Sequence, residues 1–159
     1  MKKIKLLHSF IILLIILFSI HFATNIYLIF YSPYYGNLIG DSYNFLIFGF
    51  YTQFIGFVFS LISFIALFFI KSGLYSTLKN GYFNKVSSKK FKIAGRLFFI
   101  SGSLSLTWDV FLLFYTNGET LFEGISSNIL LIFIGFSLLI ISDFINNGNV
   151  LKQENDLTI

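Results

Sequence analysis

Residues 128–142 read NILLIFIGFSLLIIS, a stretch without one charged side chain. It lies at the centre of an apolar window at 125–145, and a helix of about 20 mostly apolar residues can cross the roughly 30 Å hydrocarbon layer of a membrane. Three windows of the same kind precede it, at approximately 6–30, 45–70 and 91–115. Such continuous runs lack the alternation of a membrane β-strand, so we predict an all-α membrane protein with four transmembrane helices.

The composition of the chain supports this class. Of the 159 residues, 56% are hydrophobic and only 11% are charged, whereas a soluble domain carries roughly 25% charged residues. The chain has no Cys, which excludes disulfides, thiolate metal sites and a cysteine nucleophile. His8 and His21 are the only histidines, and neither lies in an H-E-x-x-H pattern. We therefore predict no metal site, no cofactor and no catalytic residue, and we do not expect an enzyme.

The basic residues predict how the chain crosses the membrane. They precede the first window, separate the second from the third, begin the third, and follow the fourth: Lys2, Lys3, Lys5, Lys71, Lys79, Lys85, Lys89, Lys90, Lys92, Arg96 and Lys152. The two other connections, at 31–44 and 116–124, contain no Lys or Arg. Basic loops stay on the cytoplasmic side of a membrane. Both termini, the loop at 71–90 and the tail at 146–159 are therefore predicted to be cytoplasmic, within a single four-span domain.

A cleaved signal peptide is the competing interpretation of the first window, with MKKIK as its charged region. The apolar stretch that follows is longer than the usual 7–15 residues of a signal peptide. The small-residue candidate HFAT, at 21–24, lacks the A-x-A pattern of a cleavage site. We predict an uncleaved first span.

Small and polar residues indicate where helices touch, because close approach of helices in lipid depends on small side chains and polar contacts. They recur three, four or seven residues apart in the last three windows: Gly49, Gln53, Gly56, Ser60 and Ser63; Gly95, Phe98, Gly102, Ser105 and Asp109; Gly124, Asn128, Gly135 and Ser142. These spacings match the 3.5-residue period of left-handed packing. We predict a four-helix bundle, helical extensions within the loop at 71–90, and a break at Asn80-Gly81.

Polar residues inside the windows allow two interpretations. Counting 1.5 Å per residue from the outer ends places His21, Gln53 and Asp109 roughly 10–15 Å deep, and Asn25 shares a helix face with His21. In the first interpretation Asp109 and His21 pair and exchange a proton, as in a small transporter or channel subunit. In the second, Asp109 is interfacial beside Trp108, and His21 and Gln53 are hydrogen-bonding packing residues.

The cytoplasmic face combines a basic loop with an acidic tail. The loop attracts anionic lipid headgroups, at roughly 1 kcal/mol for each basic residue near the surface, and we predict no direct nucleic-acid binding. The tail GNVLKQENDLTI, at 148–159, carries apolar residues that need cover from the loop or from a partner. We expect the tail to be ordered against the loop and the two to form one docking surface. Its candidate residues are Phe83, Lys89, Lys90, Gly148, Leu151, Glu154, Asp156 and Leu157.

The ending SDFINNGNVLKQENDLTI, with Gly148, Leu151, Glu154 and the terminal DLTI, resembles the C-terminal signature of the YoaS-like bacterial membrane proteins. These form a domain-of-unknown-function family with four predicted spans. The segment LKNGYFNKVSSKKFKIAGRL, with Phe83 and Gly95, is similar to the family's stretch between spans two and three. Here Gly-Tyr precedes Phe83, where the family often has Lys-Pro.

The resemblance implies a bacterial inner-membrane protein without an established enzyme activity. Members of the family are often encoded beside a small Cro/CI-type helix-turn-helix regulator, which implies a cytoplasmic protein partner. The expectation is therefore a regulatory or scaffolding membrane protein, with the transporter or channel subunit as the alternative. The sequence leaves a homo-oligomer open.

Overall fold

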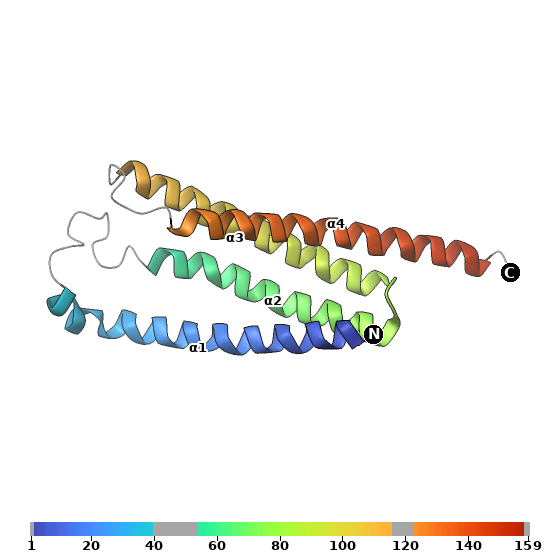
Figure 1. The fold of residues 1–159 in the computed structure, drawn as a ribbon, viewed down its shortest axis with the longest axis horizontal. Helices are drawn as coiled ribbons and strands as arrows, with labels where there is room; N and C mark the ends of the chain where they lie inside the picture. Colours follow the sequence, from blue (N-terminus) through green and yellow to red (C-terminus); the bar gives the residue numbers. More distant parts are fainter. Residues whose placement is uncertain (1, 40–53, 116–122, 158–159) are drawn as a thin grey trace.

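The computed structural model describes residues 2–39, 54–115 and 123–157, and within them it contains four helices (Figure 1). These are α1 (Lys2–Ile39), α2 (Ile55–Asn80), α3 (Lys85–Tyr115) and α4 (Glu123–Leu157). Each is long and apolar enough to span a membrane. The predicted all-α, four-helix membrane bundle is confirmed, and the chain is a multi-pass membrane protein.

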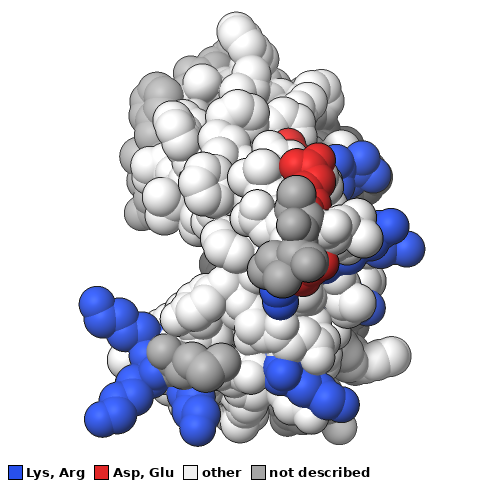
Figure 2. Space-filling model, turned by 90° about the vertical axis from the view of Figure 1, so that its right-hand side faces the viewer, with Lys and Arg blue, Asp and Glu red and all other residues white. Residues whose placement is uncertain are grey.

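Consecutive helices run in opposite directions and pack in the order α1–α2–α3–α4 (Figure 1). The N-terminal end of α1, the turn between α2 and α3, and the C-terminal end of α4 lie at the same end of the bundle. We call it the basic end, because the Lys and Arg side chains surround it, with acidic residues over the end of α4 (Figure 2). Helix α3 packs most extensively on α4 and next on α2, and α1 packs on α2 over a smaller area.

The turn between α2 and α3 follows from its sequence. Helix α2 ends at Asn80, and Gly81 has φ +87°, a positive value that glycine adopts without a side-chain clash. The Asn84 carboxamide then begins α3: its oxygen accepts the Ser87 N–H at 2.7 Å and the Ser76 hydroxyl at 2.9 Å, and its nitrogen donates to the Gly81 carbonyl at 2.7 Å. Both the break and the helical extension of α2 were predicted from the sequence.

Two helix ends differ from the prediction. Helix α1 continues to Ile39, where a connection was expected from Tyr31, and α4 continues through the tail to Leu157. Extending an existing helix adds a backbone hydrogen bond for each residue. A helix can therefore continue beyond its apolar window where no helix-breaking residue ends it. The 35 residues of α4 amount to about 52 Å of helix, well beyond the roughly 30 Å of a hydrocarbon layer.

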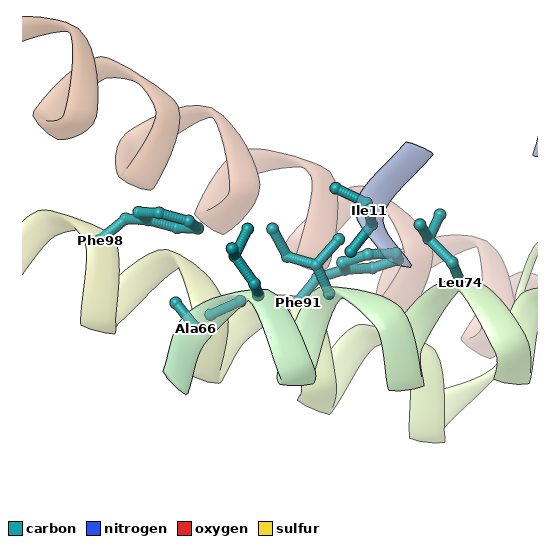
Figure 3. Close-up of a cluster of buried hydrophobic side chains, with 8 residues drawn as sticks. Ile11, Ala66, Leu74, Phe91 and Phe98 are labelled. Atoms are coloured by element: carbon teal, nitrogen blue, oxygen red, sulfur yellow. The ribbon is translucent and has the colours of Figure 1, made fainter. Parts of the chain in front are cut away.

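The buried apolar core lies where α1, α2 and α3 meet, toward the basic end (Figure 3). Its members are Ile11, Ala66, Leu67, Ile70, Leu74, Phe91, Ala94 and Phe98. The α2 members are separated by one, three and four residues and those of α3 by three and four, so each helix presents one stripe to its neighbour. This core fixes the lateral position of α3 and of the turn that precedes it.

Candidate functional site

The interface of α3 and α4 is built from small residues that face each other at seven-residue intervals. Ser88 and Ser142 each donate a hydroxyl hydrogen bond to the other's backbone carbonyl, at 2.9 Å in both directions. One heptad further in, a Cβ on Gly95 would lie 2.8 Å from the Gly135 carbonyl oxygen, and a Cβ on Gly135 would lie 2.6 Å from the backbone nitrogen of Phe99. The two backbones therefore touch, as the glycine spacing predicted.

The same interface continues away from the basic end. A Cβ on Gly102 would meet Ile132 of α4 at 2.9 Å. One heptad beyond, the Asn128 amide donates to the Asp109 carboxylate at 2.6 Å, and the same carboxylate lies against Gly124 at the start of α4. Asp109 is thus paired with α4, near the amino-terminal end of that helix, where a negative charge is favourable.

The interface of α2 and α3 has a second set of polar contacts. The Ser63 hydroxyl donates to the Ser101 hydroxyl at 2.8 Å, and the Thr77 and Ser87 hydroxyls are 2.6 Å apart. Between them, Gly73 lies against the ring of Phe91. The line of small and polar residues predicted for α2, here called its seam, is correct at Ser63. The contacts of α2 with α3 continue toward the basic end through residues that the spacing argument did not include.

Other predicted seam residues do not reach a neighbouring helix. Gly56 is exposed and has nothing within 4 Å of a Cβ position, and the Ser60 hydroxyl bonds to Phe57 of its own helix. Gly49 and Gln53 lie outside the described residues. On the outward side of Ser63, α2 is still joined to α3 at Phe59, whose backbone carbonyl accepts the Ser101 hydroxyl at 2.8 Å.

His21 and Asp109, which the first of the two interpretations paired, each have another partner in the structure. The Asn25 amide nitrogen donates to the His21 carbonyl at 2.9 Å and lies 3.1 Å from His21 Nε2. Phe22 packs between Phe57 and Phe64 of α2, which places His21 level with the Ser63–Ser101 contact. Asp109 is about two helical turns further toward the other end, or roughly 10 Å away along the bundle.

The described part of the bundle therefore contains two separate polar contacts at different depths rather than one polar layer. His21 and Asn25 lie on α1, while Asp109 and Asn128 join α3 to α4. Within the described residues no group of three His, Cys, Asp or Glu side chains could hold a metal ion. His21 and Asp109, the two ionisable residues of the transporter interpretation, therefore lie on different levels of the bundle.

At the basic end, the turn between α2 and α3 meets the last turns of α4. The Phe83 ring lies directly against Gly148, at a distance that leaves no room for a Cβ. A groove of about 570 Å³ opens beside this contact, and the predicted docking residues Leu151 and Asp156 line it. Its full lining is Phe83, Phe144, Asn147, Gly148, Leu151, Lys152, Asn155 and Asp156.

The remaining docking candidates lie outside this groove. Lys89 is exposed on α3, Lys90 lies over the Phe69 ring at 5.3 Å, and Glu154 is exposed on α4. The tail meets the loop at Gly148, against the Phe83 ring, whereas Leu157 is 87% exposed and does not pack against the loop. The tail follows the direction of its own helix and moves away from the turn (Figure 1).

Phe144 and Asn155 line the groove but were not among the candidates. Together with Gly148 and Leu151 they recur at four-, three- and four-residue steps, which places them on one helix face. That signal was present in the sequence. It was missed because the tail was treated as a segment separate from the fourth span.

We compared the chain with protein families, curated proteins and solved structures. No family model matches it, and neither a curated protein nor a solved structure is similar to it. The likeness to the YoaS-like proteins stays a prediction from the two segments that carry it.

Proposed function

We propose that this protein is a non-enzymatic scaffold or regulator in the cytoplasmic (inner) membrane of a bacterium, and that the groove beside Phe83 and Gly148 receives a cytoplasmic protein. Both termini and the turn between α2 and α3 lie on the cytoplasmic side in this proposal. The positive-inside rule supports that orientation, since the basic residues gather at one end of the bundle (Figure 2).

The observation that carries the proposal is the length of α4 relative to the membrane. If its span ends near Ile145, the residues from Asn146 to Leu157 extend about 18 Å beyond the hydrocarbon layer. This extension is a helix with Leu151 61% exposed and Leu157 87% exposed. Large apolar side chains on a helix in water indicate a surface that another protein covers.

The groove has the chemistry of a peptide or helix acceptor. Phe83, Phe144 and Leu151 supply apolar contact area, and Lys152 and Asp156 place opposite charges on its rim. Amphipathic helices bind such grooves through apolar residues on one face. The YoaS-like resemblance favours a small helix-turn-helix regulator as the partner. The lysines of the basic end would hold anionic lipid headgroups and keep the bound partner near the membrane.

The proposal is tested by crosslinking and affinity purification of the full chain from its own membranes. Gly148→Leu places a side chain where the Phe83 ring lies, so it should abolish partner recovery, and Leu151→Ser should reduce it at least severalfold. Lys89→Gln is the matched control, because Lys89 lies at the basic end but outside the groove. Unchanged recovery after deletion of 149–159 would refute the docking role.

A further inference from the structure

One face of α1 has no neighbour among the described residues. Helix α1 packs mainly on α2, and a stripe on its other side is exposed at Phe10, Leu17, His21, Thr24 and Leu28. These positions lie seven, four, three and four residues apart, which matches the 3.5-residue period of a left-handed helix pair. Exposed apolar residues in this stripe suit lipid, but the imidazole of His21 does not.

His21 lies near the middle of the membrane. Its neighbour Phe22 contacts Phe57 and Phe64 of α2, and the midpoint of those two residues is about 15 Å along the helix from Lys71, where the basic end begins. A hydrocarbon layer is roughly 30 Å thick. A polar side chain at that depth, facing outward, lacks water and is expected to face protein.

The hydrogen bonds of this pair leave one donor and one acceptor unused. A neutral imidazole has one N–H donor and one acceptor nitrogen. The Asn25 amide nitrogen, itself a donor, lies 3.1 Å from His21 Nε2 and 3.4 Å from His21 Nδ1, so it offers no acceptor to the imidazole N–H in either tautomer. Within the described residues that N–H has no acceptor, and the Asn25 side-chain oxygen has no donor. An unused donor and an unused acceptor thus lie side by side on the exposed face.

We infer that this face of α1 binds the α1 of a second copy of the chain. Two copies inserted in the same direction and related by a twofold axis along the membrane normal bring their His21–Asn25 pairs to the same depth. The His21 N–H of each copy then donates to the Asn25 oxygen of the other, which makes the surface self-complementary. A shallow hollow of about 290 Å³, lined by Leu17, Phe18 and His21, opens on this face and can receive a side chain of the second copy.

The inference does not depend on the docking role of the groove, which lies at the basic end and on other helices. It also selects the second copy over lipid and over an unrelated helix. Lipid tails offer neither the donor nor the acceptor that the pair needs. An identical surface offers both, in the matching positions.

The chain contains no Cys, so single cysteines report contacts without background. Leu17→Cys and Thr24→Cys should form disulfide-linked dimers when the purified full chain, reconstituted in liposomes at high dilution, is oxidised. Leu130→Cys is the matched control: Leu130 is 60% exposed, lies on α4, and is at a depth between the two test positions. We expect dimer yields at least tenfold higher at the α1 positions. Equal yields at all three positions would overturn the inference.

Energy transfer between singly labelled copies tests the role of the polar pair. His21→Leu should weaken dimerisation by about three- to tenfold, the effect typical of one or two interhelical hydrogen bonds in lipid. His21→Gln keeps a donor and an acceptor and should restore most of the affinity. A dimer that His21→Leu leaves equally stable, or a wild-type chain that stays monomeric in pure lipid, would contradict the inference.

Discussion

Helices α3 and α4 meet through small and hydroxylated residues, whereas α1 meets α2 through aromatic rings. At the first interface, the Gly95 and Gly135 backbones touch, and Ser88 and Ser142 bond to each other's carbonyl oxygens. At the second, Phe22 packs edge-on against Phe64 at a centroid distance of 4.8 Å. Lipid is as apolar as phenylalanine, so ring packing in a membrane gains less than it does in water.

Hydrogen bonds between helices also distinguish α3 from α1. The hydroxyls of Ser19 and Thr24 on α1 donate to carbonyls of α1 itself. His8 Nε2, next to the Tyr75 ring, has no hydrogen-bond partner among the described residues. Polar side chains of α3, in contrast, bond to both of its neighbours. Helices α2, α3 and α4 therefore form a fixed unit, and α1 is the helix whose position depends most on what else binds it.

The largest effect is expected at the glycine contact of the fixed unit. Gly135→Leu would drive a side chain into the Phe99 and Gly95 backbones, and neither backbone can yield without separating the helices. We expect a loss of at least about 3 kcal/mol of unfolding free energy, comparable to severe overpacking, in a detergent or bicelle denaturation assay. Gly56→Leu is the control, because nothing lies within 4 Å of its Cβ position. Similar losses of stability in both variants would show that the glycine contact does not set the fixed unit apart from the rest of the bundle.

A smaller effect is expected where α1 meets α2. Phe22→Ala removes the ring that packs between Phe57 and Phe64, and the lost dispersion contacts amount to about 1 kcal/mol when lipid replaces them. Phe30→Ala, at a ring that is 78% exposed, should change the unfolding free energy by less. If Phe22→Ala costs more than Gly135→Leu, α1 belongs to the fixed unit and the distinction fails.

The serine contacts between α3 and α4 should contribute individually less. Ser142→Ala removes one hydroxyl bond to α3 and leaves Ser88 able to reach the backbone carbonyl, so we expect about 0.6 kcal/mol, the mean value for such bonds in a membrane. Ser137→Ala is the matched control, because its hydroxyl bonds to Phe133 of its own helix. Indistinguishable stabilities of the two variants would show that the Ser88–Ser142 pair adds no interhelical stability.

The smallest effect is expected for the ion pair at the basic end. Lys92 Nζ lies 3.5 Å from Asp143, and the two side chains are 47% and 66% exposed. Exposed pairs of this kind contribute about 0–1 kcal/mol and are screened by salt. Asp143→Asn should therefore lower stability measurably only at low ionic strength, in the same unfolding assay run at two salt concentrations. A salt-independent loss would indicate a different role for Asp143.

The packing of the fixed unit was largely predictable, because small residues repeat along its contact lines. Gly95, Gly102, Gly135 and Ser142 repeat at a packing period, and small residues at that period in an apolar helix indicate contact. Side-chain pairing was less predictable. Depth counted along separate spans suggested a His21–Asp109 pair, but only the lateral register, set by contacts such as Phe22 with Phe64, shows that the two lie on different levels.

The path of the tail was also not predictable from the sequence, although its surface character was. Its acidic and apolar residues predicted a surface, and Leu151 and Asp156 do line a groove with Phe83. Its path was not predictable from charge, because exposed ion pairs are too weak to bend a helix back toward the loop. The direction of α4 decided it, and that direction is set by the glycine contacts with α3.

The fixed unit holds the turn between α2 and α3 and the first part of the tail together as one surface. A disulfide between Phe83→Cys and Gly148→Cys tests it most directly, in the otherwise Cys-free full chain in intact membranes. We expect near-complete crosslinking of this pair, little for Phe83→Cys with Leu157→Cys, and loss of the first crosslink when Gly135→Leu is added. Absence of the Phe83–Gly148 crosslink, or equal crosslinking of both pairs, would contradict it.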